Sequence, residues 1–206
     1  MSQIFDNITV VDFSWGMAGS VATMVFSDFG ANVIKVEPPE GDPFRSHPAS
    51  RMWHRGKKSV ILDLKTPAGQ EQARDLALSA DVVVVSFRPG TADRLGIGYE
   101  ALTAQRPDII YCSLTGFGTK GRYANFKGYE GMAAARSGRF MDFAAQSGRE
   151  GPHYAAVQSA NHTAAMAIVR GATAALYVRD KTGQGQKVET TLLQAISIYD
   201  QSDWIF

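Results

Sequence analysis

Cysteine is nearly absent from this chain, since Cys112 is the only one among 206 residues. A disulfide within the chain is therefore excluded, and so is a zinc site built from paired cysteines. Cysteine usage of this kind fits a reducing compartment, and we expect a cytoplasmic location. The sequence also has no apolar run of about 18 residues, so no membrane span is predicted.

An excess of charge is missing as well. The formal net charge is +1, whereas proteins that bind nucleic acids usually carry a basic patch or stripe. His47 and His54 lie seven residues apart without the spacing of a zinc-binding helix, so we interpret them as solvated loop histidines and predict no metal site. The chain also has no P-loop and no G-x-S-x-G elbow. Residues 15–19 match the dinucleotide pattern G-x-G-x-x-G only loosely, which argues against a nicotinamide dehydrogenase.

What the sequence does contain is a regular alternation of short β-rich runs and helical patterns. Strands are expected at residues 8–13, 33–36, 59–62, 82–85, 109–114 and 186–190. Helices are expected at residues 18–29, 67–79, 99–105, 128–138, 160–179 and from 192 onward. This alternation predicts an α/β fold, a parallel sheet with helices on both of its faces.

Several local signals support these boundaries. Thr66 followed by Pro67 is a good helix start, because the hydroxyl caps free N–H groups and proline suits the first helical turn. The all-valine run Val82–Val85 indicates a strand buried on both faces. Gly183 provides a helix stop. Residues 38–58, rich in proline, glycine and basic side chains, are predicted to form a loop.

Ligands of open parallel sheets bind beyond the carboxyl ends of the strands. Residues 14–19, 37–42, 86–90 and 115–118 fall at such ends and are the candidate binding segments. The basic segment 51–58 has two interpretations, a solvated surface run or a set of cations that holds the phosphates of a ligand beside the aromatic face of Trp53.

A family resemblance rests on motifs that follow one another along nearly the whole chain. They include Phe-Gly-Ala-Asn-Val-Ile-Lys-Val-Glu-Pro at 29–38, Arg-Gly-Lys-Lys-Ser-Val at 55–60, Leu-Asp-Leu-Lys-Thr-Pro-Ala-Gly at 62–69, Phe-Arg-Pro-Gly at 87–90 and Lys-Thr-Gly-Gln-Gly-Gln at 181–186. Together they resemble class III coenzyme A (CoA) transferases, the group of formyl-CoA and carnitine CoA-transferases.

The resemblance implies a Rossmann-like fold and an enzyme that moves CoA from an acyl-CoA to a free carboxylic acid, with CoA thioester and acid as its substrates. An aspartate of the family attacks the thioester and forms first a mixed anhydride and then an aspartyl-CoA thioester. Members are roughly twice as long and form interlocked dimers, here a homodimer or a heterodimer with a homologous subunit. Residues 1–206 are accordingly expected to be an N-terminal CoA-binding domain that lacks the family's smaller domain. The apolar end Trp204, Ile205 and Phe206 agrees with that expectation.

Candidate site residues follow from the resemblance position by position. The expected CoA contacts are Gly16, Met17, Ala18, Leu62, Lys65, Ser86, Phe87, Arg88, Arg94, Leu95 and Lys127. Glu130 matches an acidic residue beside the catalytic aspartate.

The catalytic aspartate itself falls on Asn161, which carries a neutral amide that cannot form the anhydride. Asn161 is also interpretable as a helix cap, because asparagine is among the best capping residues. Racemases of the superfamily use a histidine where this chain has Tyr129, so racemase chemistry is disfavoured. The alternative to a transferase is a non-catalytic half that binds CoA or completes the fold, while a partner chain or fused domain carries the aspartate.

Overall fold

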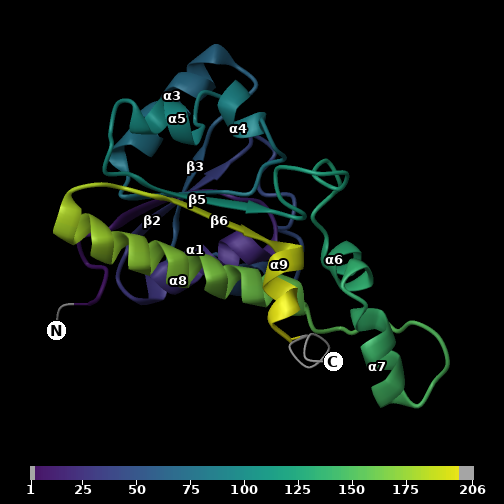
Figure 1. Ribbon diagram of the computed structural model, residues 1–206. Coiled ribbons are helices and arrows are strands. Elements are labelled where there is room, and N and C mark those ends of the chain that lie inside the picture. Colours follow the sequence, from purple (N-terminus) through teal and green to yellow (C-terminus); the bar gives the residue numbers. More distant parts are fainter. Residues whose placement is uncertain (1–2, 200–206) are drawn as a thin grey trace.

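The computed structural model describes residues 3–199, apart from the side chains at positions 143, 145–147 and 199. Within this range six strands form one sheet in which every neighbouring pair is parallel (Figure 1). The strands are β1 (Thr9–Phe13), β2 (Asn32–Glu37), β3 (Lys58–Ile61), β4 (Val82–Val85), β5 (Ile110–Thr115) and β6 (Lys187–Thr191). Their order, β3-β2-β1-β4-β5-β6, is that of the doubly wound Rossmann fold, so the predicted fold class is confirmed.

Helices connect the strands and cover the sheet. They are α1 (Met17–Asp28), α2 (Ser50–Trp53), α3 (Pro67–Ser79), α4 (Thr91–Arg94), α5 (Tyr99–Thr103), α6 (Glu130–Arg136), α7 (Arg139–Ser147), α8 (Ser159–Thr182), α9 (Leu192–Ile196) and the 3-10 turn η1 (Ser197–Tyr199). Thr66 caps α3 as predicted, because its Oγ1 accepts a hydrogen bond from the N–H of Gly69 at 3.1 Å. Gly183 ends α8 in the left-handed conformation, with φ of 72°.

Three helices were not predicted from the sequence. Helix α2 lies inside the predicted loop 38–58, and α4 follows β4; each has only four residues, too few for a helical period to show. Helix α7 follows α6 directly, separated from it by Ser137 and Gly138. In Figure 1, α6 and α7 project away from the sheet.

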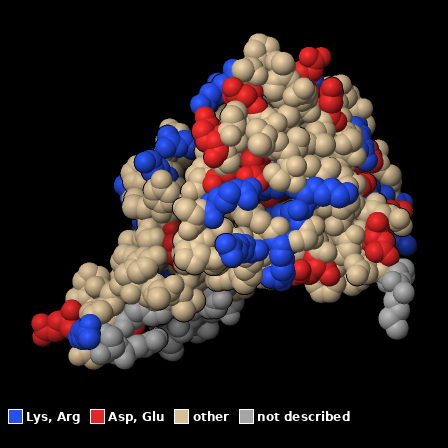
Figure 2. Space-filling model, turned by 180° about the vertical axis from the view of Figure 1, so that it is seen from behind, with Lys and Arg blue, Asp and Glu red and all other residues tan. Residues whose placement is uncertain are grey.

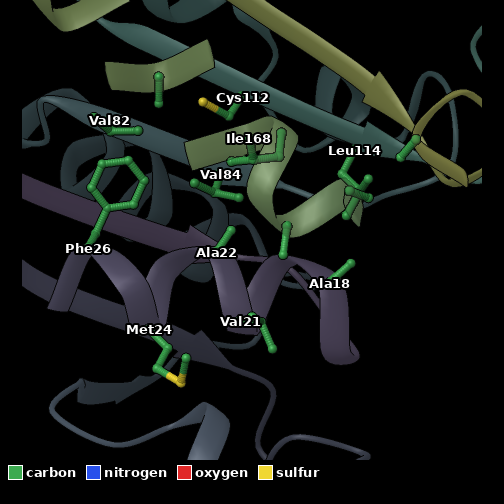
Figure 3. Packing of buried hydrophobic residues seen from close by; sticks show 14 of the residues in the cluster. Ala18, Val21, Ala22, Met24, Phe26, Val82, Val84, Cys112, Leu114 and Ile168 are labelled. Carbon is green, nitrogen blue, oxygen red and sulfur yellow. The ribbon is translucent and has the colours of Figure 1, made fainter. Parts of the chain in front are cut away.

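Each face of the sheet carries its own hydrophobic core. Because successive side chains of a strand point to opposite faces, Val82 and Val84 belong to one core and Val83 to the other. Figure 3 shows Ala22 of α1 and Ile168 of α8 beside Val84 in the first core. Helices α3 and α5 contribute to the second core. The four valines of β4 are all buried, which confirms the predicted strand with both faces buried.

The described residues contain neither a membrane-spanning helix nor a cluster of metal-binding side chains. None of the helices within residues 3–199 is long and apolar enough to cross a membrane. In the same part of the chain no group of three histidine, cysteine or acidic side chains is placed to hold a metal ion. The apolar end Trp204, Ile205 and Phe206 lies outside the described residues.

Candidate active site

A large cleft opens at the carboxyl ends of the strands. Its volume is about 1170 Å³, and its walls include parts of each of the four candidate binding segments. Since the chain reverses its winding direction between β1 and β4, the cleft lies at the switch point where doubly wound folds bind their ligands.

The cleft brings together every predicted site residue except Arg94. Its lining includes Gly16, Met17, Ala18, Leu62, Lys65, Ser86, Phe87, Arg88, Leu95, Lys127, Glu130 and Asn161. Arg94 lies on the exposed side of α4, where its Nη2 donates a hydrogen bond to Thr91 Oγ1 at 3.0 Å. Of the predicted arginine–leucine pair, only Leu95 faces the cleft.

Aromatic side chains cover part of the wall on both sides of the switch point. Trp15 follows β1 and Phe87 follows β4, and their rings meet edge to face at 6.5 Å between centroids. The two loops are also tied by a hydrogen bond from the N–H of Trp15 to Ser86 Oγ at 2.8 Å. Trp15 is 48% exposed, so its ring is open to a ligand in the cleft.

Three cations face the cleft: Lys65, Arg88 and Lys127. Within the described part of the chain none of them forms an ion pair with a carboxylate, although Lys127 lies 5.8 Å from the ring centroid of Tyr129. Cations without acidic partners at a ligand-sized cleft suit an anionic ligand.

The basic segment 51–58 is mainly a solvated surface run, as one of its two interpretations predicts, because Arg51, Arg55 and Lys58 are exposed. Arg55 pairs with Asp28 on the surface, but the side chain of Lys57 is only 2% exposed and pairs with Asp12. Trp53 offers no exposed aromatic face, because it is buried and stacks on His47. On the face shown in Figure 2, lysine and arginine side chains gather across the middle with acidic side chains beside them.

A buried ionic network centres on Asp12, and sequence reasoning missed it. Asp12 accepts hydrogen bonds from Ser14 and Thr23 and lies 3.1 Å from Lys57 Nζ and 3.5 Å from Lys35 Nζ. Burial opposes the charged form, but the two lysines and the hydroxyl donors outweigh it and hold the pKa of Asp12 well below its usual range. The network therefore anchors the start of the cleft to the sheet.

His54 extends this network and is not the solvated histidine that we predicted. Its Nε2 lies 3.7 Å from Asp42 Oδ2, and its side chain is 16% exposed. Burial, together with the nearby Lys57 and Lys35, lowers the pKa of His54. The neutral form of the imidazole is thereby favoured.

Glu37 at the end of β2 stands where dinucleotide-binding folds place the acid that holds a ribose. Here its carboxylate is already engaged by Arg45, by Ser59 Oγ at 2.7 Å and by the N–H of Asp42 at 2.9 Å. Burial raises the pKa of Glu37, but these partners outweigh burial and lower the pKa to about 2. A carboxylate so occupied agrees with the absence of the nicotinamide fingerprint.

Glu130 and Asn161 lie in direct contact at the cleft. The Oε2 of Glu130 accepts the backbone N–H and the side-chain amide of Asn161, each at 2.8 Å, and Oε1 accepts the N–H of Ala160 at 2.8 Å. Asn161 is not the cap of α8, because Gln158 holds that position and Asn161 is the third helical residue. Its amide also donates to Gln158 Oε1 at 3.1 Å. The buried carboxylate of Glu130 thus satisfies the N–H groups of the first helical turn.

This arrangement limits the chemistry available at position 161. An amide has no charge and cannot form an anhydride, and both carboxylate oxygens of Glu130 are occupied by N–H donors. Geometry therefore gives no reason to regard Glu130 as a substitute nucleophile.

Other lining residues were not predicted as site residues. Tyr154, Gln158, Phe44, Phe126 and Leu192 all face the cleft. Gln158 was detectable in principle, because it precedes Asn161 by three residues, the spacing of neighbours on one helix face. The others come from loops or a short helix, and nothing in their local pattern marks them.

Comparison with known proteins agrees with this geometry. The family model for CoA-transferase family III matches residues 5–204. The chain is 36% identical over 192 residues to the CoA-transferase/lyase DddD of Marinomonas sp. (strain MWYL1). This alignment covers 92% of this chain and 23% of DddD. It is 35% identical over 206 residues to a succinate–glutarate CoA-transferase of Agrobacterium fabrum, with 92% of this chain and 51% of that protein covered.

A solved structure, that of the hypothetical protein Rv3272 from Mycobacterium tuberculosis, matches with a TM-score of 0.92 at 31% identity. The match covers 100% of this chain and 60% of that one. The chain spans about half of the succinate–glutarate enzyme and about a quarter of DddD. The match of the family model over nearly the whole chain decides the assignment: this chain belongs to CoA-transferase family III.

Proposed function

We propose that the protein containing this chain is a CoA-transferase, which moves CoA between an acyl-CoA and a free carboxylic acid, and that the cleft holds the CoA thioester. The observation that carries the proposal is the convergence of twelve predicted contact and catalytic positions on one cleft at the switch point. Named relatives that act as CoA-transferases support the reaction class.

The cleft offers groups that suit each part of CoA. Trp15 and Phe87 provide aromatic surface for the adenine ring. Lys65, Arg88 and Lys127 provide positive charge for the phosphates. Asn161 and Glu130 face the same space and are where we place the thioester end. We propose no role for a metal ion in this reaction.

Covalent transfer needs a carboxylate nucleophile. Its oxygen attacks the thioester carbon, the C–S bond breaks, and the CoA thiolate leaves a mixed anhydride behind. The thiolate then attacks the enzyme's carbonyl in this anhydride, which frees the first acid and forms an enzyme–CoA thioester. Asn161 cannot take the first step.

The amide at Asn161 therefore favours a second candidate function. In it, this unit binds CoA or completes the fold, and the aspartate belongs to a partner chain or fused domain. The stretch that matches this chain is 23% of DddD but 51% of the succinate–glutarate enzyme, so DddD is about twice as long as that enzyme. A chain of that length has room for a second unit.

We further propose a dimer, either of identical chains or with a homologous subunit, located in the cytoplasm. Met132, Met141, Tyr154 and Val157 are exposed on or beside the projecting helices α6 and α7, and exposed apolar side chains of this kind often mark an interface. Light scattering tests this directly. A dimeric mass for the full-length protein supports the proposal, and a stable monomer contradicts it.

The reaction itself is tested by incubating the full-length protein with an acyl-CoA and a labelled carboxylic acid, with hydroxylamine as a trap. We expect label in the CoA thioester pool. Mass spectrometry should locate the trapped adduct on a residue other than Asn161. An adduct on Glu130 would overturn our assignment of its role, and the absence of exchange with any acid would count against the transferase.

A further inference from the structure

The chain leaves β5 at Gly116 and returns to the same place at Gly128. An ideal Cβ on Gly116 would lie 2.5 Å from Gly128 Cα, and one on Gly128 would lie 2.9 Å from Gly116 Cα. Neither distance is possible for a real side chain, so two backbones touch here only because both residues are glycine. We call this contact the glycine neck.

One side of the neck is fixed to the body of the protein. The carbonyl of Gly116 accepts a hydrogen bond from the N–H of Leu193 in α9 at 3.1 Å. Two residues later, the N–H of Gly118 donates to Thr115 Oγ1 at 2.9 Å. The Gly116 side therefore keeps the position of the end of β5, and the returning side is located by contact with it.

The loop between the two glycines has its own packing. The rings of Phe117, Tyr123 and Phe126 meet at centroid distances of 5.2–6.2 Å. Arg122 and Arg136 lie over the Tyr123 ring at 4.7 and 5.3 Å. A loop with near ends and internal side-chain packing is an Ω-loop, a class that is frequently functional.

The returning side of the neck leads directly into the cleft. Lys127 precedes Gly128, and both line the cleft with Tyr129 and Glu130. Glu130 in turn holds the first turn of α8 through Ala160 and Asn161. The contact between Gly116 and Gly128 thus sets where Lys127 stands relative to the strand ends.

We propose that Gly128 is a positioning residue: the glycine neck fixes Lys127 in the cleft, ready to pair with a phosphate of CoA. This inference rests on the proposed function, since it assumes that CoA occupies the cleft. A methyl group at Gly128 would push the returning side away from Gly116 and take Lys127 out of place. Neither glycine has a positive φ, so an alanine there acts through this contact and not through backbone strain.

A double-mutant cycle on the full-length protein tests the proposal, with CoA affinity measured by calorimetry. We expect Gly128→Ala and Lys127→Met each to weaken CoA binding about tenfold, a loss of about 1.4 kcal/mol. The double variant should also be weakened about tenfold, because both changes remove the same contact. A general structural defect would instead add to the loss of Lys127 and give about a hundredfold.

Thr119→Ala is the matched control. Thr119 lies exposed in the same loop and is absent from the cleft wall. We expect its CoA affinity to equal that of the wild type. Wild-type affinity in Gly128→Ala, or additive losses in the double variant, would overturn the inference while leaving the proposed function intact. Failure of the wild-type protein to bind CoA would refute the proposed function, and this inference with it.

Hydrogen exchange of the wild-type protein gives a second test that does not depend on a variant folding. If the neck sets the position of Lys127 in advance, the amide of Tyr129, which donates a hydrogen bond to the carbonyl of Lys127 at 3.0 Å, should exchange slowly without CoA and change little when it is added. Rapid exchange that slows only on CoA binding would mean that the ligand orders this segment, which contradicts the proposal.

Discussion

Glu130 Oε2 accepts two hydrogen bonds from one residue, the backbone N–H and the side-chain amide of Asn161, both at 2.8 Å. An aspartate at position 161 would keep the first bond and replace the second by two carboxylate oxygens in contact. Like charges this close share a proton. The neutral amide of Asn161 therefore suits the carboxylate of Glu130, because it donates a hydrogen bond to it. Asparagine in place of aspartate thus removes a negative charge from the site as well as the nucleophile.

Asn161→Asp should make stability depend on pH in a new way. The folded variant holds a proton between Glu130 and the new aspartate that the unfolded chain has lost by neutral pH. Its free energy of unfolding should therefore fall as pH rises from 5 to 8, by about 1–3 kcal/mol relative to the wild type. Urea titrations at both pH values measure this.

The same exchange at Asn32 serves as the control. Its side-chain oxygen accepts a hydrogen bond from Lys58 at 2.7 Å, so an aspartate there gains a cation as its partner. We expect no loss of stability at pH 8 in Asn32→Asp. Equal stability of Asn161→Asp and the wild type at both pH values would mean that the contact with Glu130 is not as described.

Asn161→Asp should also allow a covalent adduct at position 161 in the full-length protein, if the amide is the sole defect.

Glu130→Gln should destabilise the protein by about 1–3 kcal/mol, because a neutral amide cannot satisfy the N–H groups of Ala160 and Asn161 together. Thermal or urea unfolding followed by circular dichroism measures the loss. Glu100→Gln is matched to it, since Glu100 also lies in a first helical turn but is exposed. If both variants lose the same small amount, Glu130 does not hold the start of α8.

Acid should weaken the fold partly through His54. Burial and the neighbouring Lys57 and Lys35 lower its pKa in the folded state, although Asp42 and Asp12 act in the opposite direction. Below the ordinary histidine pKa of about 6.5, the unfolded state then binds more protons than the folded one, and stability falls as pH falls.

His54→Gln should therefore flatten the loss of stability between about pH 6.5 and 5, as followed by urea midpoints. His162→Gln provides the comparison, because His162 lies exposed on α8. An unchanged pH dependence in His54→Gln, or an equal change in both variants, would show that His54 is not the group responsible.

The sheet was predictable from the sequence because its signals are local. The run Val82–Val85 can be buried only as a central strand, and Thr66 with Pro67 marks a helix start within two residues. The buried network was not predictable in this way. Asp12 and Lys57 are 45 positions apart, and a basic residue in a basic segment gives no sign that it pairs with a distant acid.

In the candidate site, too, some features were predictable from the sequence, whereas contacts between distant residues were not. The positions of Lys65, Ser86 and Lys127 in one cleft followed from the family resemblance and from the rule that parallel sheets bind ligands at strand ends. The position of Arg94 outside the cleft wall was not predicted, because α4 is a single short turn that directs this side chain outward. The pairing of Glu130 with Asn161 depends on how α6 meets α8, which no local pattern specifies.

Binding of CoA in the cleft is tested by titrating the full-length protein and its variant Lys65→Met/Arg88→Met with CoA. We expect one CoA per cleft, an affinity that falls with added salt, and a loss of affinity of at least about tenfold in the double variant. Arg55→Met, which removes a surface cation paired with Asp28 and absent from the cleft wall, should bind as the wild type does. No binding of CoA by the wild type, or equal affinity in the wild type and Lys65→Met/Arg88→Met, would contradict the proposal that the cleft binds CoA.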